Sequence, residues 1–204
     1  MHLIPKQEEV VSVLRETGAL RTGHFEYPNG LHSDGYLQVP LAMRHYQYQR
    51  MFSVGLSRLI RANPELRAII GDVSIVAPAT GGLPVAFGVC EALQAKQVYW
   101  AEREHDDEPL RFRQFLTPGP GDPVIMVDDI LRTGSKLSEM KQLLESHGAV
   151  VLALAVVVYQ PTPTTITFDP LPTCWLAKLD AHYYTGADSC EMCRRAEPLD
   201  KIRL

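Results

Sequence analysis

Apolar and polar positions in this chain form two alternating kinds of segment. From residue 73 onward, continuous runs of apolar, largely β-branched residues are separated by stretches of helix length, at about 82–95 and 135–147. The apolar runs are VSIVA (73–77), VYWAE (98–102), VIMVDD (124–129) and VVLALAVVVY (150–159). Continuous apolar strands separated by helices are typical of a parallel sheet that is buried on both faces. The pattern predicts an α/β fold with an open, mostly parallel sheet flanked by helices.

The N-terminal part of the chain shows a different pattern. Residues 6–17 place their apolar positions near one face of a short amphipathic helix, and 47–62 has the same helical period. Between them, HFEY (24–27) and GYLQV (35–39) flank a cluster of turn residues, which indicates two short strands around a turn. We therefore expect an N-terminal flap.

The composition shifts again after residue 160, where prolines punctuate two short β-like pieces at 165–168 and 174–179. This tail is expected to pack back as an extension at the edge of the sheet. No internal repeat or low-complexity stretch calls for a second independent domain. The predicted organisation is a single domain with an N-terminal flap or hood (1–46), a core (47–160) and a C-terminal β extension (161–204).

Composition and charge exclude several classes of partner. Lys plus Arg number 20 and Asp plus Glu 24, a formal net charge of −4, so the basic surplus typical of nucleic-acid binding is missing. No apolar run is long enough to span a bilayer, and Pro5, Glu8 and Glu9 stand where a signal peptide needs an apolar core. We expect a cytoplasmic protein with no nucleic-acid or membrane partner. The 4 cysteines are too few for a disulfide scaffold and are expected to be thiols.

Chemistry-bearing residues gather where the strand at 124–129 ends, and ligands of open parallel sheets bind beyond the carboxyl ends of strands. The strand delivers Asp128 and Asp129 to that edge, and paired carboxylates hold vicinal hydroxyls or a hydrated divalent cation. The turn at 132–136 then opens a helix and offers backbone N–H groups, two hydroxyls and a lysine charge, all suited to a phosphate. The string predicts a site for a sugar and its phosphate. Helix capping and a plain tight turn are the structural alternative.

Two nucleotide-binding motifs are missing, although an apolar strand that ends in two acids also resembles a Walker B strand. The chain has no G-x-x-x-x-G-K-[ST] loop, and Gly119 and Gly121 precede a strand instead of following one. A second glycine-containing turn, Thr80 to Gly82, stands at a strand-to-helix junction, where missing side chains let backbone amides approach an anion. A tight turn with helix capping explains that segment equally well.

The residues from Val124 to Lys136 resemble the binding motif for phosphoribosyl pyrophosphate (PRPP) in type I phosphoribosyltransferases. That motif has an apolar strand, two acids, two aliphatic residues and a Thr/Gly-rich phosphate loop. Arg132 and Lys136 depart from it, because the family usually has small residues there. The resemblance is closest to the orotate enzymes. It includes segment 18–38 over the base, the pyrophosphate loop at 77–86, a mobile lid at 100–115 and a C-terminal segment that begins CEMC.

This resemblance implies an Mg²⁺-dependent transfer of phosphoribosyl from PRPP to a base nitrogen, most simply that of orotate. It implies a catalytic role for Asp128, Asp129 and Arg103, with both acids on the ribose hydroxyls and Arg103 on the pyrophosphate. The ion would be held mainly through PRPP, with the two acids as indirect ligands, and a homodimer is expected. PRPP-binding residues would be Arg132, Thr133, Gly134, Ser135, Lys136, Thr80, Gly81 and Gly82, and base-binding residues His32, Ser33 and Tyr36.

Two departures leave the substrate open. The lid has no lysine, so Arg103 is the nearest cation. The orotate enzymes also carry an arginine for the base carboxylate after the last core strand, where this chain has Tyr159 and Gln160. Candidate replacements are Arg44, Arg194 and Arg195. A phosphoribosyltransferase for another base, and a PRPP- or nucleotide-binding regulator without turnover, are the alternative functions.

The C-x-x-C pair at Cys190 and Cys193 is open to more than one interpretation. It is half of a zinc site if Cys174 and His182 complete it, and otherwise a surface thiol pair or a reversible disulfide. The other histidines, among them His24, His32, His45 and His147, have no spacing typical of a metal site.

Overall fold

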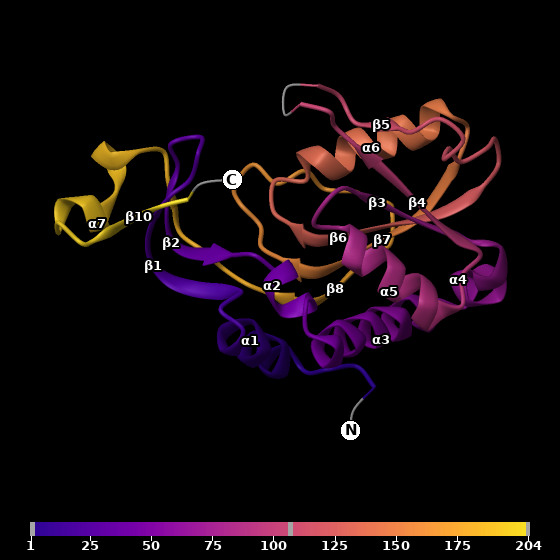
Figure 1. Ribbon diagram of the computed structural model, residues 1–204, viewed down its shortest axis with the longest axis horizontal. Helices are drawn as coiled ribbons and strands as arrows, with labels where there is room; N and C mark the ends of the chain where they lie inside the picture. The colour runs from indigo at the N-terminus through magenta and orange to yellow at the C-terminus, as the bar shows by residue number, and fades with distance from the viewer. Residues whose placement is uncertain (1–2, 106–107, 203–204) are drawn as a thin grey trace.

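The chain builds two β-sheets, which a computed structural model describes over residues 3–105 and 108–202 (Figure 1). The larger sheet has six strands in the order β5-β4-β3-β6-β7-β8, and every neighbouring pair is parallel except β4 and β5. Its strands are β3 (Ser74–Pro78), β4 (Gln97–Glu102), β5 (Arg111–Phe112), β6 (Pro123–Leu131), β7 (Val150–Tyr159) and β8 (Thr173–Lys178). The predicted α/β fold with a mostly parallel sheet is confirmed.

Helices cover both faces of this sheet, which is why its strands are apolar on both sides. In Figure 1, α3 and α5 lie below the sheet and α6 lies above it. Alternate residues of β3 and β6 point to the two sides, so Ile75 and Ile125 pack toward α3 and α5, while Val76 and Met126 pack toward α6. The helices are α1 (Gln7–Glu16), α2 (Pro40–Met43), α3 (Tyr46–Ala62), α4 (Pro64–Ile69), α5 (Leu83–Leu93) and α6 (Ser135–Ser146), with a short 3₁₀ turn η1 (Ile70–Asp72).

A smaller sheet joins the two ends of the chain, at the left of Figure 1. Its strand order is β10-β1-β2-β9, with β1 parallel to β10 and antiparallel to β2. The strands are β1 (Leu20–Glu26), β2 (His32–Leu37), β9 (Tyr183–Tyr184) and β10 (Leu199–Lys201), and η2 (Ala187–Ser189) and α7 (Glu191–Arg194) lie between the last two. The hairpin of the N-terminal flap thus has a C-terminal strand on each side.

The tail contains one correction to the sequence-based elements. Residues 174–179 do supply an edge strand, β8, but 165–168 forms no strand. Instead Ile166 N donates to the carbonyl of Thr133 (2.8 Å) and Thr165 Oγ1 donates to that of Arg132 (2.6 Å). The apolar alternation of this piece therefore reflects packing against the turn that precedes α6.

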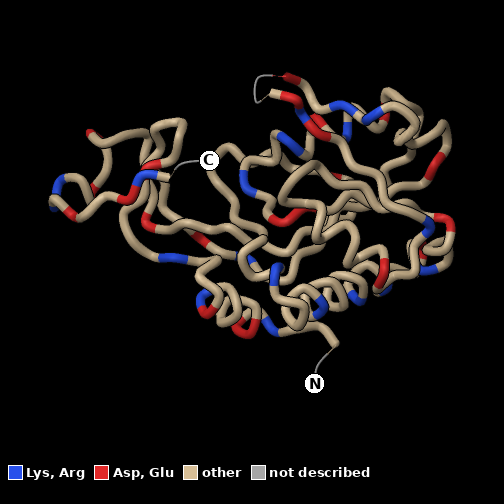
Figure 2. Tube along the Cα trace, viewed as in Figure 1, with Lys and Arg blue, Asp and Glu red and all other residues tan. Residues whose placement is uncertain are grey.

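Charged residues of both signs alternate along the trace in the core and in the smaller sheet (Figure 2). Several form ion pairs with close neighbours in space: Lys201 with Glu26 on the adjacent strand (2.9 Å), and Lys141 with Glu145 one turn along α6. Within the described ranges, none of the helices has the length and apolar character needed to cross a membrane.

A glycine in the middle of α3 gives a stability test of how the N-terminal segment packs on the core. A Cβ on Gly55 would lie 2.7 Å from Pro5 Cδ and 2.9 Å from Leu176 Cδ2. Gly55→Ala should therefore destabilise the protein by about 1–2 kcal/mol, because overpacking outweighs the gain of about 0.5–1 kcal/mol that alanine brings to a helix interior. Urea unfolding measures the difference. Gly71→Ala is the control, since no heavy atom lies within 4 Å of its Cβ position; a stabilised Gly55→Ala variant would contradict the packing.

Candidate functional site

The paired acids lie on the central strand β6, whose neighbours are β3 and β7. Asp128 is buried, with 7% of its surface exposed, and its Oδ1 accepts a hydrogen bond from Asp129 N (2.9 Å). Asp129 Oδ1 accepts in turn from Ile130 N (2.9 Å). The strand continues to Leu131, so the two acids lie in the C-terminal part of β6 and not in the loop that follows it. Their backbone is therefore fixed by the sheet.

Burial dominates the electrostatics of this pair. It raises the pKa of Asp128 well above its ordinary value, and the charge of Asp129 raises that pKa further. The pKa of Asp129 is also raised by burial, and the charge of Lys136 opposes both shifts. A buried and a half-buried carboxylate, with one nearby lysine, form a site that hydroxyl donors or a cation would stabilise.

The turn at Thr80–Gly82 lies directly against the acids. A Cβ on Gly81 would stand 2.9 Å from Asp129 Oδ2, and one on Gly82 would stand 3.0 Å from Asp128 Oδ1. Only residues without a side chain fit these two positions, and the exposed Thr80 precedes them. The turn expected to hold a pyrophosphate thus lies against the acids expected to hold a ribose, because β3 and β6 are parallel neighbours whose ends meet at one edge.

The turn between β6 and α6 has the form expected of an anion site. Gly134 has φ of +80° and precedes the first turn of α6, and a Cβ there would lie 3.2 Å from Ile166 Cβ. Thr133 Oγ1 accepts from the backbone N (3.4 Å) and the hydroxyl (3.3 Å) of Ser135. Thr133, Ser135 and Lys136 are exposed at the N-terminus of the helix, where backbone N–H groups point outward.

Arg132 belongs to the same turn, but its side chain leaves it. Its Nε donates to Gln160 Oε1 (3.1 Å), and its guanidinium lies 5.4 Å from the ring centre of Tyr27 and 5.9 Å from that of Tyr183. Tyr183 also donates to Gln160 Oε1 (3.1 Å). Among the described residues, buried Nη2 of Arg132 has no hydrogen-bond partner. The structure thus brings a cation to the exit of β7, where the sequence alone offers Tyr159 and Gln160.

The sequence did not identify Tyr27, Tyr183 or Gln160 as neighbours of this arginine. Tyr27 follows the first strand of the flap and Tyr183 lies in the C-terminal tail, so only the tertiary fold joins them. Of the other arginines considered, Arg195 pairs with Glu191 (3.6 Å) and Glu197 (3.8 Å) beside α7. Arg194 is the last residue of α7, and Arg44 directly follows α2.

The three residues expected at the base lie in different surroundings. His32 is buried, with its Nδ1 2.8 Å from His24 Nε2. Ser33 is wholly buried, and its hydroxyl accepts from Gly35 N (3.2 Å). Tyr36 is half-buried, 6.1 Å from the ring of Tyr27. Tyr36 is thus near the ring of Tyr27, and Ser33 pairs across the sheet with Tyr183, the second ring that neighbours Arg132.

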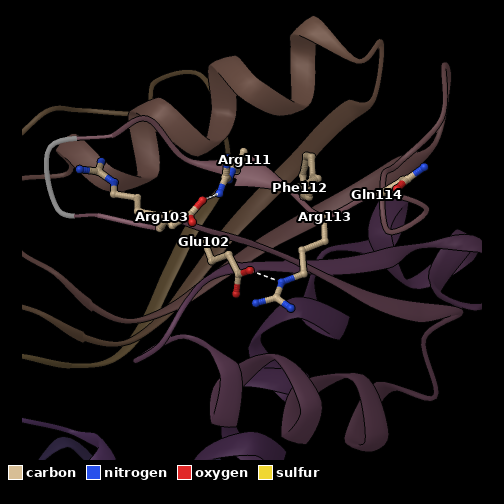
Figure 3. Close-up of a pocket in the computed structure, with 7 residues that line it drawn as sticks. Glu102, Arg103, Arg111, Phe112, Arg113 and Gln114 are labelled. Atoms are coloured by element: carbon tan, nitrogen blue, oxygen red, sulfur yellow. Dashed lines mark hydrogen bonds and ion pairs between the residues drawn. The ribbon is translucent and has the colours of Figure 1, made fainter.

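The lid arginines line an open cleft of about 780 Å³ formed by residues 102–104, at the end of β4, and 111–114, at and after β5 (Figure 3). Arg103 pairs with Glu139 of α6, whose other oxygen accepts from Leu110 N (2.6 Å). Arg111 pairs with Glu104, and Figure 3 shows the Arg113 guanidinium turned toward Glu102. Each of the three lid arginines thus has an acidic partner. Asp106 and Asp107 of the lid lie outside the described residues.

The C-x-x-C pair lies with two histidines of the hairpin, which corrects the sequence interpretation. Nitrogen and sulfur atoms of His24, His32, Cys190 and Cys193 all lie within 4.8 Å of one another. The partners considered earlier are elsewhere: Cys174 is in β8, where burial raises the pKa of its thiol to about 12, and His182 Nδ1 pairs with Asp34 Oδ2 (2.8 Å). A linear metal-binding spacing misses such a cluster, because the hairpin turn joins the two histidines.

Comparisons with known proteins identify the family of this chain. Residues 60–165, more than half of the chain, match the family model of the phosphoribosyl transferase domain. An orotate phosphoribosyltransferase of Carboxydothermus hydrogenoformans is 31% identical over 194 residues, 95% of each chain. One from Thermotoga maritima is 30% identical over 193 residues, 94% of this chain and 96% of the relative.

Solved structures share the fold. The orotate phosphoribosyltransferase of Aeropyrum pernix superposes with a TM-score of 0.67 at 20% identity, over 83% of this chain and 93% of that one. A phosphoribosyltransferase of Corynebacterium diphtheriae gives 0.61 at 24% identity, over 84% and 95%. With the family match, the relatives and the paired acids between two glycine-containing turns, the chain belongs to the phosphoribosyltransferase family, a group of glycosyl-transferring enzymes.

Proposed function

We propose that this chain transfers the phosphoribosyl group of PRPP to orotate, with Mg²⁺, to give orotidine 5′-phosphate and pyrophosphate. The observation that carries the proposal is the convergence on one sheet edge of two adjacent acids, two turns that suit anions and an arginine whose Nη2 has no hydrogen-bond partner among the described residues. The names of the curated relatives support orotate as the base. A homodimer and a cytoplasmic location stay predictions from the resemblance.

The phosphate end of PRPP fits the turn before α6. Its exposed hydroxyls and backbone N–H groups stand at the N-terminus of a 12-residue helix, where the helix dipole adds positive potential. Lys136 lies in the first helical turn, and its positive charge lowers the pKa of both acids. In this proposal it balances the 5′-phosphate on one side and the acid pair on the other.

The ribose and the ion fit the acid pair. Asp128 and Asp129 are acceptors held by the sheet, and ribose hydroxyls would donate to them. Mg²⁺ prefers oxygen ligands and keeps several waters, so two adjacent carboxylates in need of a counter-charge suit it as indirect ligands. When bound, the ion would supply positive charge to the pyrophosphate. The rest of the chemistry is done by residues of the chain.

Transfer exchanges a C–O bond for a C–N bond at the anomeric carbon. The electron pair of the breaking bond goes to a pyrophosphate oxygen, the base nitrogen forms the new bond and loses its proton, and the ribose becomes oxocarbenium-like between the two. Such a reaction needs stabilisation of the leaving anion more than a strong nucleophile. Backbone N–H groups at Thr80–Gly82 and the Arg103 guanidinium are the groups proposed to meet that anion.

The lid must move for Arg103 to act in this way. Arg103 is now paired with Glu139, whose second oxygen also holds the lid backbone at Leu110. In the proposal, bound pyrophosphate competes with Glu139 for this arginine, and the lid closes over the substrate to exclude water. Glu139 lies one turn after the phosphate-binding turn, so it couples the lid to the helix that holds the substrate.

The base fits beside Arg132. A carboxylate of orotate would accept from the unpartnered Nη2, while Nε stays on Gln160 and the rings of Tyr27 and Tyr183 enclose the guanidinium. A buried cation that lacks its anion makes a site that rejects uracil, which has no carboxylate. Arg132 then replaces the arginine that the orotate enzymes carry after the last core strand.

Replacing both acids tests their role in turnover and the cost in folding stability of burying their charge. Asp128→Asn with Asp129→Asn should lower turnover at least about 100-fold, because the ribose loses charged acceptors. The ionised Asp128 destabilises the fold above its raised pKa, and this penalty disappears as the pH falls toward the ordinary value of 3.8. The variant should therefore melt roughly 2–4 °C higher at pH 8 without ligand, and by less at pH 5. Calorimetry and pyrophosphate release measure both; unchanged turnover would refute the assignment.

Substitution of Arg132 tests the base. Arg132→Ala should lower kcat/KM for orotate roughly 100-fold and remove the preference for orotate over uracil, while Arg132→Lys should keep part of it. Competition between orotate, uracil, hypoxanthine and adenine at fixed PRPP is the measurement. Arg195→Ala is the matched control and should leave the preference unchanged. A purine preference in the wild type would overturn orotate, and PRPP binding without turnover of any base would favour the regulator.

Glu139→Gln tests the lid. Weakening the competitor for Arg103 should lower KM for PRPP by roughly two- to fivefold, in line with the small energies of half-exposed ion pairs. Steady-state kinetics with PRPP as the varied substrate provide the measurement. Glu145→Gln, the same change on the same helix at the Lys141 pair, is the control and should have no effect. A higher KM in Glu139→Gln would mean that this pair holds the lid in its productive position.

A further inference from the structure

A second cluster of chemistry-bearing side chains lies in the smaller sheet, away from the acid pair. His24 belongs to β1 and His32 to β2, while Cys190 directly precedes α7 and Cys193 lies within it. Their four ligand atoms lie within 4.8 Å of one another. Segments more than 150 residues apart in sequence thus supply two nitrogen and two sulfur donors to one point.

The distances match a tetrahedral zinc centre. With Zn–N of about 2.0–2.1 Å and Zn–S of about 2.3 Å, tetrahedral geometry places nitrogen and sulfur ligands about 3.6 Å apart. Cys190 Sγ lies 3.5 Å from His24 Nε2, and Cys193 Sγ lies 3.5 Å from both His24 Nε2 and His32 Nδ1. The two ring nitrogens, 2.8 Å apart, need only a small outward shift to reach about 3.3 Å.

Hydrogen bonding alone does not explain this arrangement. His24 Nδ1 lies 3.1 Å from the carbonyl oxygen of Glu197, which only accepts, so a neutral ring carries its proton on Nδ1. Nε2 then has one lone pair, and three neighbours crowd it: His32 Nδ1 and the two thiols. One lone pair cannot accept three such donors well, whereas a cation among the four atoms satisfies them all. The carbonyl of Glu197 is also the outer partner that orients a zinc-bound histidine.

The fold holds the donors in place before any ion binds. Alternate residues of a strand share a face, so His24 and Glu26 lie on one side of β1, and Glu26 pairs with His32 across the hairpin. Both histidines are 4% exposed and Cys190 is wholly buried, with Cys193 half-buried. Arg194 N donates to the carbonyl of Cys190 (3.2 Å), which closes the turn that brings the two sulfurs to the same side.

We propose that His24, His32, Cys190 and Cys193 bind one structural Zn²⁺ ion, separate from the Mg²⁺ proposed for catalysis. Two thiolates and two neutral imidazoles balance the charge of Zn²⁺, and soft sulfur with imidazole ligands selects zinc over magnesium or calcium. All four positions are taken by the protein, as in structural zinc sites, so no open position remains for a substrate.

The ion fastens the C-terminal segment to the flap hairpin. Ligand His32 pairs in register with Tyr184, and the next pair, Ser33 with Tyr183, carries the ring that encloses Arg132. The smaller sheet has only short strands beside the hairpin, and an isolated hairpin is marginally stable. Zinc therefore stabilises the smaller sheet, and Tyr27 and Tyr183 reach the candidate base site from this part of the chain.

Metal analysis of the whole chain tests the site directly. Protein purified without chelators should contain about one zinc ion per chain by plasma mass spectrometry. After exchange with Co²⁺, it should show thiolate-to-cobalt charge-transfer absorption and the visible bands of a tetrahedral centre. Cys193→Ser should lose most of the bound zinc, and its melting temperature should fall. Cys90→Ser is the matched control, because Cys90 lies in α5 outside the cluster and its sulfur donates to the carbonyl of Ala95.

Each outcome bears on the proposal. Stoichiometric zinc in the wild type and in Cys90→Ser, with loss in Cys193→Ser, supports it. Metal-free wild type that gives no cobalt–thiolate band after incubation with Co²⁺ overturns it, as does a Cys190–Cys193 disulfide in the purified protein or iron in place of zinc. If Cys193→Ser does not fold, the wild-type zinc content and cobalt spectrum still decide. These readouts do not depend on phosphoribosyl transfer, so failure of the proposed function leaves them intact.

Discussion

The rest of the site depends on two adjacent carboxylates that the fold withdraws from solvent, Asp128 fully and Asp129 in part. Asp128 and Asp129 are fixed by β6 and lie against a turn whose glycines leave no room for a Cβ. Burial raises the pKa of both groups, so ionising them in the unliganded protein costs free energy that a ligand can offset. The acid pair lowers the free energy of unfolding of the unliganded protein, and a ligand that binds the folded state raises it again.

The surroundings of the acids follow from this constraint. Lys136 opposes their charge from the first turn of α6, and the small residues at 80–82 allow the turn after β3 to approach. Arg103, the other cation expected near the site, is paired with Glu139. The negative charge of the acids is therefore only partly balanced from within the chain, which suits a site for a cation and for hydroxyl donors.

The smaller sheet depends on contacts between the two ends of the chain. A two-stranded hairpin alone is only marginally stable, and here the C-terminal segment adds a short strand on each side. The cluster of two histidines and two cysteines lies where these segments meet, and Arg132 with its three neighbours lies where the hairpin faces the core. The N-terminal and C-terminal segments are thus needed together at both places.

The sequence by itself determined the core sheet and placed the acid pair and the two glycine-containing turns at the ends of strands. Each of these is a local pattern: apolar runs of strand length, acids directly after them, and glycines at strand-to-helix junctions. Only the tertiary structure decided the side-chain partners. It turned Arg132 toward Gln160, placed 165–168 beside the phosphate turn, and joined His24 and His32 to the C-x-x-C pair. These contacts join residues 28 to 169 positions apart, and periodicity carries no information about which distant side chains converge.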